Sequence, residues 1–95
     1  MPKITRLQIE ENLKQLNGWE YIDGALEITF ECKDFKEAFA VMTRIAVVCE
    51  KQNHHPEWSN RYQKINIRLK THDTNSITHK DIKLAHTIQK IITSK

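Results

Sequence analysis

Residues 23–32 constrain the fold most strongly, because they join a tight-turn signal to a strict alternation of side chains. Asp23-Gly24 is a dipeptide that favours a two-residue turn between antiparallel strands. The positions that follow alternate between the two faces of a strand, with Leu26, Ile28, Phe30 and Cys32 on one face and Glu27, Thr29 and Glu31 on the other. Such alternation is typical of a strand that buries one face. We therefore expect a hairpin whose two strands cover residues 19–22 and 26–32.

A second hairpin is expected at residues 58–62 and 64–70, because Ile65, Ile67 and Leu69 alternate there with polar residues. Helices are expected at residues 5–16, 34–52 and 78–92, where apolar residues recur at helical spacing. Each helix starts with a capping side chain and a partner three residues later, in the pairs Thr5 and Gln8, Asp34 and Glu37, and Thr78 and Asp81.

The order helix, two strands, helix, two strands, helix predicts the fold class α+β. Its simplest packing is a four-stranded antiparallel sheet with three helices packed on one face. A chain of 95 residues is the size of one small domain, so residues 1–95 are expected to form a single unit.

The charge pattern argues against nucleic acid as a partner, because 15 Lys and Arg are scattered among 12 Asp and Glu. The densest basic stretch, residues 61–70, is expected to be a solvated strand face, and an RNA-binding α+β domain is the alternative interpretation. No apolar run approaches the ~20 residues that span a bilayer, so no membrane partner is expected. Met1-Pro2-Lys3 leads directly into a mixed-charge helix, which predicts no signal peptide. Cys32 and Cys49 fall on apolar faces, which favours buried thiols in a cytoplasmic protein.

The chemistry of the chain is concentrated in three histidines, at His54-His55-Pro56 and at His72. Imidazole can both give and take a proton near neutral pH. His54 and His55 lie where the second helix ends, and His72 lies where the last strand ends, so the three rings can share one edge of the sheet. Pro56 holds His55 in an extended backbone. Glu50, one helical turn before His54, is placed to bond an imidazole and set its tautomer.

There are two alternatives to a catalytic role for the histidine cluster. The first is a metal site, which is not expected because neighbouring residues in an extended chain project to opposite sides and no cysteine pattern completes a tetrahedral set. The histidines could also be solvent-exposed loop residues without a shared function.

The wider spacing Glu50-x3-His54-His55-Pro56-x5-Tyr62-x9-His72-x8-Asp81 resembles the signature of the pterin-4a-carbinolamine dehydratases. The resemblance implies the same architecture and a hydro-lyase that removes water from a 4a-hydroxytetrahydropterin to give quinonoid dihydropterin. This reaction regenerates the pterin cofactor of aromatic amino-acid hydroxylases, and it needs neither metal nor cofactor. By motif, His54 and His72 would be the acid/base pair, and His55 would bind the pterin and assist at the carbinol.

The resemblance also suggests substrate contacts for Glu50 and Asp81, although Asp81 is equally well explained as a helix-start residue. Trp19 and Trp58 could stack on a flat heterocycle, and core packing is the alternative for each. Asn75-Ser76 replaces a glycine pair that many family members carry after the third histidine. Asn tolerates unusual backbone angles, so the loop can keep its path.

A second hypothesis is a protein-interaction module, because some animal members of this family act as dimerisation cofactors of a transcription factor. The second helix offers a broad apolar face, made of Phe35, Phe39, Met42, Ile45, Ala46 and Cys49. The simpler use of this face is self-association, so a homo-oligomer, dimer or tetramer, is expected.

Overall fold

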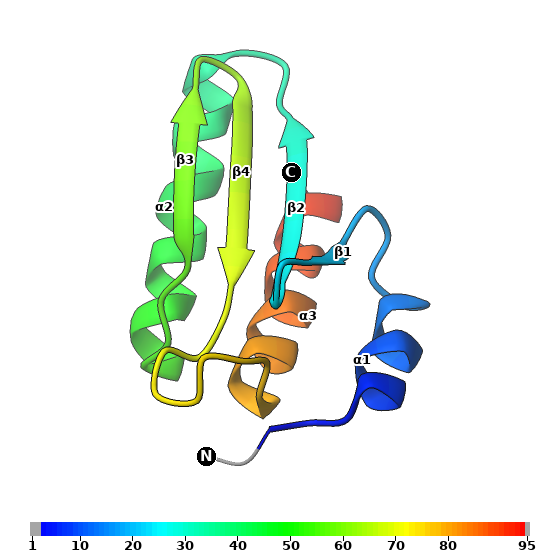
Figure 1. Cartoon of the computed structure of the whole chain (residues 1–95). Coiled ribbons are helices and arrows are strands. Elements are labelled where there is room, and N and C mark those ends of the chain that lie inside the picture. Colours follow the sequence, from blue (N-terminus) through cyan, green and yellow to red (C-terminus); the bar gives the residue numbers. More distant parts are fainter. Residues whose placement is uncertain (1–2, 95) are drawn as a thin grey trace.

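The computed structural model describes residues 3–94, and their helices and strands follow the predicted α-β-β-α-β-β-α order (Figure 1). The elements are α1 (Arg6–Leu13), β1 (Glu20–Ile22), β2 (Ala25–Glu31), α2 (Phe35–Gln52), β3 (Glu57–Arg61), β4 (Lys64–Leu69) and α3 (His79–Thr93). Met1 and Pro2, where no signal peptide is expected, and Lys95 lie outside the described residues. No helix within residues 3–94 is long and apolar enough to cross a membrane.

The strands form one antiparallel sheet with the order β1-β2-β4-β3. The turn between β1 and β2 contains Asp23 at φ 50° and Gly24 at φ 77°, which confirms the hairpin predicted from this dipeptide. Ile67 at the centre of β4 lies opposite Ile28 of β2 and Trp58 of β3. The alternation read from the sequence therefore sets the register, because a shift of one residue would turn the apolar side chains outward.

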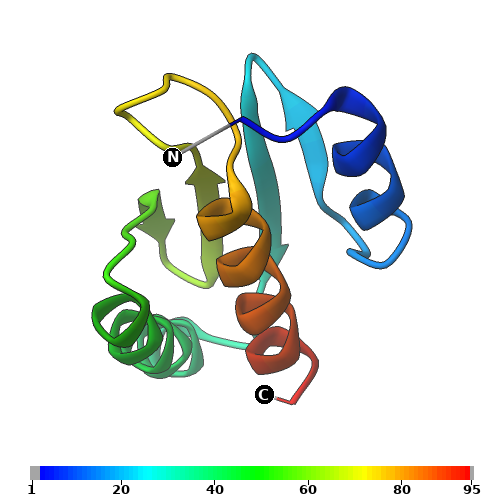
Figure 2. The same ribbon diagram turned by 90° about the horizontal axis from the view of Figure 1, so that it is seen from below.

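The helices cover one face of the sheet, which confirms the predicted α+β architecture (Figure 2). Helices α2 and α3 lie side by side in opposite directions, and α1 lies next to the β1 end of the sheet (Figures 1 and 2). The core between the layers takes side chains from all of these elements, including Ile9, Leu16, Leu26, Ile45, Ile65, Ile67, Leu84 and Ile88. Thr5 and Thr78 both form the predicted capping boxes.

Helix α1 is shorter than predicted, because it ends at Leu13 and the chain reaches Gly18 through successive turns. Helix α2 also differs from expectation in its capping and in its faces. Asp34 accepts from the Glu37 N–H as predicted, but the Glu37 carboxylate accepts from the Lys33 N–H instead of closing a box on Asp34.

The apolar face predicted for α2 divides into a buried part and an exposed part. Ala38, Val41, Ile45 and Cys49 are buried against the sheet and α3. Phe35 and Phe39 are 53% and 58% exposed, with their ring centroids 5.9 Å apart. The buried residues recur every three or four positions, so this narrower stripe meets the rest of the domain and leaves the two phenylalanines outside it.

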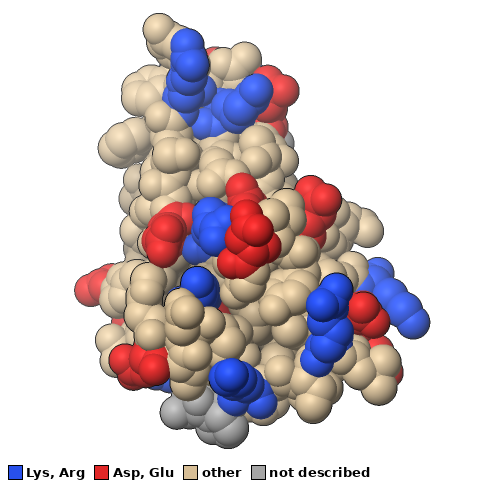
Figure 3. All heavy atoms as spheres, in the orientation of Figure 1, with Lys and Arg blue, Asp and Glu red and all other residues tan. Residues whose placement is uncertain are grey.

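The other face of the sheet is open and carries charges of both signs (Figure 3). At its centre, the Glu27 carboxylate accepts from Arg68 Nη1 at 3.0 Å and from Asn66 Nδ2 at 2.8 Å. This strand face is therefore mixed and partly ion-paired, unlike the continuous positive stripe that nucleic-acid binding requires.

Candidate active site

The end of α2, the start of β3, the end of β4 and the start of α3 lie at one end of the sheet (Figures 1 and 2), and the three predicted histidines meet there. His54, His55 and His72 line a single concavity of about 350 Å³. This volume lies within the range of small-molecule sites, roughly 300–1,000 Å³. Segments eighteen residues apart in the chain are thus brought to one hollow, as the sequence predicts.

Asn53 directs the histidine pair toward this hollow. It adopts the left-handed conformation, with φ 51° and ψ 44°, directly after the last residue of α2. The N–H of Asn53 bonds to the Glu50 carbonyl, and the N–H of His54 bonds to the Cys49 carbonyl at 3.1 Å. These two bonds make a Schellman motif, which ends the helix and fixes the direction of the following residues.

His54 is paired with a buried carboxylate. Its Nε2 lies 2.6 Å from Oδ1 of Asp81, on the first turn of α3. The Asp81 side chain has no exposed surface, and the His54 side chain is 11% exposed. A charge-assisted hydrogen bond of this length between two largely buried groups fixes the plane of the imidazole ring.

The other oxygen of Asp81 is held by two donors that precede α3 in the chain. Oδ2 accepts from the Thr71 hydroxyl at 2.8 Å and from the Thr78 backbone N–H at 2.9 Å. Asp81 therefore has both roles considered from the sequence at once, because one oxygen caps α3 and the other holds a histidine. With no exposed surface, it contacts His54 and not the open concavity.

This arrangement selects a tautomer for His54. A carboxylate has only acceptor oxygens, so Asp81 accepts this hydrogen bond and His54 Nε2 donates it. The neutral ring then carries its proton on Nε2 and a lone pair on Nδ1. An imidazole held in this way can accept a proton through Nδ1.

His55 has a carboxylate partner of a different kind. Its Nε2 lies 2.6 Å from Oε2 of Glu50, so Glu50 does bond an imidazole as predicted. The His55 side chain is 58% exposed and that of Glu50 is 78% exposed. Solvent competes for both groups, so this pair holds its ring far less firmly than the buried pair does.

His72 lies on the loop between β4 and α3. Thr71 and Ser76 close this loop through two backbone hydrogen bonds, of 2.9 and 3.3 Å. Asn75 has a φ of 52°, so it supplies the positive angle for which glycine is commonly used. The Nε2 of His72 is 3.9 Å from a Glu57 carboxylate oxygen, which is too far for a hydrogen bond, and its ring is 72% exposed.

The two tryptophans considered as stacking platforms do not line this concavity. Trp19 is 5% exposed in the core, and its Nε1–H donates to Oε1 of Gln89 at 2.9 Å. Trp58 is partly buried on the helix-covered face of the sheet and packs against the core. Both positions correspond to the core-packing alternative.

Four residues line the concavity that the sequence did not single out as site residues: Asn53, Thr71, Asp73 and Lys80. Asn53 carried a usable signal, since Asn directly after an apolar helical run favours a left-handed helix end. Thr71 carried none, because its position depends on how the end of β4 meets the start of α3.

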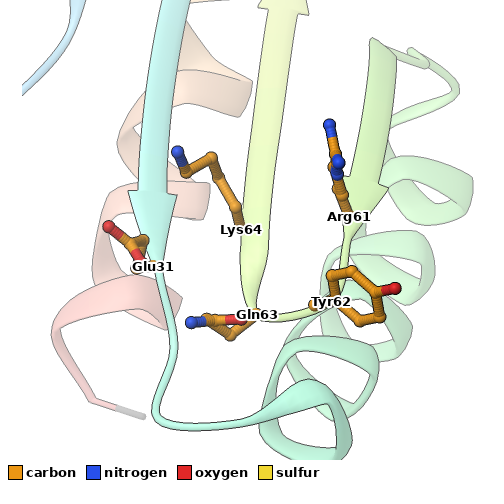
Figure 4. Close-up of a pocket in the computed structure, with 5 residues that line it drawn as sticks. All are labelled: Glu31, Arg61, Tyr62, Gln63 and Lys64. Carbon is orange, nitrogen blue, oxygen red and sulfur yellow. The ribbon is translucent and has the colours of Figure 1, made fainter.

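A second hollow, of about 270 Å³, lies at the opposite end of the sheet beside the β3–β4 turn (Figure 4). Arg61, Lys64 and Glu31 line it, and Asn60 Nδ2 braces the turn by donating to the carbonyls of Tyr62 and Lys64. The ring of Tyr62 points away from Glu31 in this view. No imidazole lines this hollow, in contrast to the concavity at the other end of the sheet.

Comparisons with known proteins show which family and which solved structure this chain resembles. Residues 2–91 match the family model described as pterin 4 alpha carbinolamine dehydratase. A Christiangramia forsetii protein named "Putative pterin-4-alpha-carbinolamine dehydratase" is 44% identical over 94 residues, covering 99% of this chain and 97% of the relative. A Prochlorococcus marinus protein of the same name is 48% identical over 84 residues and 88% of each chain. The crystal structure of a transcriptional coactivator/pterin dehydratase from Brucella melitensis superposes with a TM-score of 0.90 at 38% identity, covering 95% of this chain and 98% of that one.

Proposed function

Because the chain belongs to the pterin 4 alpha carbinolamine dehydratase family, we propose that it removes water from a 4a-hydroxytetrahydropterin by histidine general acid/base catalysis. The product is the quinonoid dihydropterin, and the reaction would return the pterin cofactor of an aromatic amino-acid hydroxylase to its cycle. Relatives named as pterin dehydratases align with nearly the whole chain, which supports the proposal that this single domain has the activity.

The proposed reaction needs two proton transfers and no redox change. The bond between the carbinol carbon and its hydroxyl oxygen breaks, and the leaving hydroxyl takes one proton to become water. The neighbouring ring nitrogen forms a double bond to that carbon and releases its own proton. A positioned acid or base contributes about 10²–10⁴-fold to such a step.

We assign the base to His54 and the acid to His72. The lone pair on Nδ1 of His54, which follows from the Asp81 contact, supports the first assignment. His72 is largely exposed and has no carboxylate within hydrogen-bond distance among residues 3–94, so a proton taken from solvent can reach it easily. This supports its role as the group that protonates the departing hydroxyl.

His55 would bind the pterin and assist at the carbinol, with Glu50 setting the orientation of its ring. For Asp81 we propose a positioning role, since its lack of exposed surface favours action through His54 over direct contact with the pterin. No metal or cofactor is needed for this chemistry, because the ring nitrogen itself expels the leaving group. The cytoplasmic location expected from the sequence stays a prediction.

One observation carries the proposal above all others: three imidazoles line the same concavity, and one of them is oriented by a buried carboxylate. A stopped-flow assay tests it by following the loss of 4a-hydroxytetrahydropterin with and without the protein. Dehydration should be faster with the protein, in proportion to its concentration. A rate equal to the buffer rate at all protein concentrations would contradict the proposed activity.

Helix α2 also carries exposed apolar side chains, which we call the exposed stripe and which support a second role in association with another chain. Phe35, Phe39 and Val47 are each more than half exposed on this helix. We propose that they mediate self-association into a homo-oligomer, a dimer or tetramer. The Brucella melitensis protein is also named a transcriptional coactivator, which supports a dimerisation cofactor of a transcription factor as the alternative use of the same stripe.

A further inference from the structure

Thr71 touches three parts of the proposed active site at once. Its hydroxyl donates to Asp81, its backbone closes the loop that carries His72, and it lines the histidine concavity. It is 7% exposed, so water does not readily replace the contacts of its hydroxyl. No motif in the sequence gives this residue a role.

The direction of its hydrogen bonds follows from counting protons. Asp81 is acceptor-only when ionised, so the single hydroxyl proton of Thr71 is used on Oδ2. The Thr71 oxygen lies 2.7 Å from the Thr78 hydroxyl oxygen, and Thr78 must therefore donate to Thr71. Thr78 in turn accepts from the Lys80 backbone N–H at 3.3 Å. A chain of donors thus runs from the start of α3 through two hydroxyls to the carboxylate that holds His54.

This series of hydrogen bonds compensates the buried charge of Asp81. Asp81 has no exposed surface, and its carboxylate receives three donors: the Thr71 hydroxyl, the Thr78 N–H and the His54 Nε2–H. A buried carboxylate is expensive unless such donors satisfy it. If one donor is removed, the carboxylate can lower that cost by binding a proton from solvent, which it then donates to Nε2 of His54. The single proton of the neutral ring would move to Nδ1 by exchange with solvent.

We propose that Thr71 is a positioning residue that holds the proton of His54 on Nε2 and so leaves Nδ1 free as a base. The inference rests on the proposed function only for its kinetic consequence, since the tautomer is a property of the protein without substrate. It adds to the family signature a residue that acts through Asp81 and not by touching the pterin.

The test compares Thr71→Val with Thr71→Ser. Valine has nearly the shape of threonine and keeps both backbone bonds to Ser76, but it lacks the hydroxyl. Serine restores the hydroxyl. Thr87→Val is the matched control, because it removes a hydroxyl from α3 that bonds to Lys83 and Gln52 and not to Asp81. Thermal unfolding of each variant checks that the domain stays folded.

The first readout is the tautomer of His54, observed by nitrogen-15 NMR of the imidazole side chains at mildly alkaline pH. We expect the wild-type protein, Thr71→Ser and Thr87→Val to carry the proton on Nε2, and Thr71→Val to shift toward Nδ1. An Nδ1 proton in the wild-type protein would overturn the inference, even if Thr71→Val did not fold. A Thr71→Val protein with unchanged tautomer would also overturn it.

The second readout is the dehydration rate. Loss of a hydrogen bond to a charged group corresponds to roughly a 10- to 100-fold lower kcat, with little change in KM. Thr71→Ser should recover most of this loss, and Thr87→Val should not show it. If the wild-type protein did not accelerate dehydration but the tautomer shifted as expected, the proposed function would fail and the positioning role would stand. Normal turnover in Thr71→Val would contradict the positioning role alone.

Discussion

His54 Nε2 and Asp81 Oδ1 lie 2.6 Å apart, although they are 27 positions apart in the chain and belong to different elements. His54 follows the end of α2, and Asp81 belongs to the first turn of α3. The N-terminus of a helix favours a negative charge, so the position of Asp81 stabilises the carboxylate that orients the imidazole. Asp81 therefore both caps α3 and orients the His54 ring.

Asp81→Asn should lower kcat by roughly 10²–10⁴-fold, because the amide turns a donor toward either His54 or the Thr71–Thr78 pair. The ring can adapt only by moving its proton to Nδ1, which removes the base. The same unmatched donor should cost about 1–3 kcal/mol of unfolding free energy. Steady-state dehydration kinetics and urea unfolding measure the two effects. Asp23→Asn, an equal change in the distant hairpin turn, should alter neither, and equal effects of both variants would refute this role of Asp81.

Glu50→Gln should have a much milder effect than Asp81→Asn. The Glu50–His55 pair is solvent-exposed on both sides, and exposed pairs contribute about 0–1 kcal/mol. We therefore expect a change in kcat/KM of no more than about fivefold, measured in the same dehydration assay. A loss as large as that of Asp81→Asn would mean that the rate depends more on the orientation of His55 than on that of His54.

Much of the fold follows from local signals that agree with one another. The Asp23-Gly24 turn, the alternation along β2 and β4, and the capping boxes at Thr5 and Thr78 each act over a few residues. The strand order β1-β2-β4-β3 is different, because β2 and β4 pair across an intervening helix and strand. Such pairing depends on how the core packs, and no short window of sequence records it.

The candidate site likewise has features that the sequence predicts and features that depend on packing. The three histidines and two carboxylates were found from their spacing, and the structure adds which carboxylate bonds to which ring. Thr71 escaped notice because its role depends on where an α3 carboxylate meets the end of β4. Trp19 was ambiguous for another reason: an indole can stack on a ligand or bury its ring, and only the position of Gln89 on α3 shows that its N–H is satisfied in the core.

Cys49 should be unreactive in the folded protein. Burial, with a smaller contribution from the neighbouring charge of Glu50, raises the pKa of its thiol from 9.0 to about 11. Iodoacetamide alkylates the thiolate, so at neutral pH Cys49 should be modified only after denaturation. Peptide mass spectrometry of native and urea-treated samples measures this, and rapid alkylation of Cys49 in the native sample would disagree with its burial.

The same shift predicts how stability depends on alkaline pH. Between pH 9 and 11 the unfolded thiol loses its proton while the folded thiol keeps it, so the free energy of unfolding should fall as pH rises through this range. The full loss is about 2–3 kcal/mol. Cys49→Ala should lose this component of the pH dependence. Urea unfolding of both proteins across the range provides the measurement, and parallel curves would count against the raised pKa.

Phe39→Glu should weaken self-association. The ring is more than half exposed and packs on Phe35, so a charge there would be desolvated in any interface that covers this stripe. Light scattering should give a multiple of 11.2 kDa for the wild-type protein and a smaller mass for the variant. Gln15→Glu, which adds the same charge after α1, is the control and should keep the wild-type mass. A monomeric wild-type protein would show that the stripe does not mediate self-association.

The most direct test of the account is the single-turnover dehydration rate of 4a-hydroxytetrahydropterin with the double variant His54→Ala/His72→Ala, followed by stopped-flow beside the wild-type protein. Circular dichroism and thermal unfolding would verify that the variant is folded. We expect the wild-type protein to accelerate the loss of water and the double variant to give the buffer rate, because both proposed proton-transfer groups are gone. Wild-type turnover by the folded double variant would contradict histidine acid/base catalysis at this site.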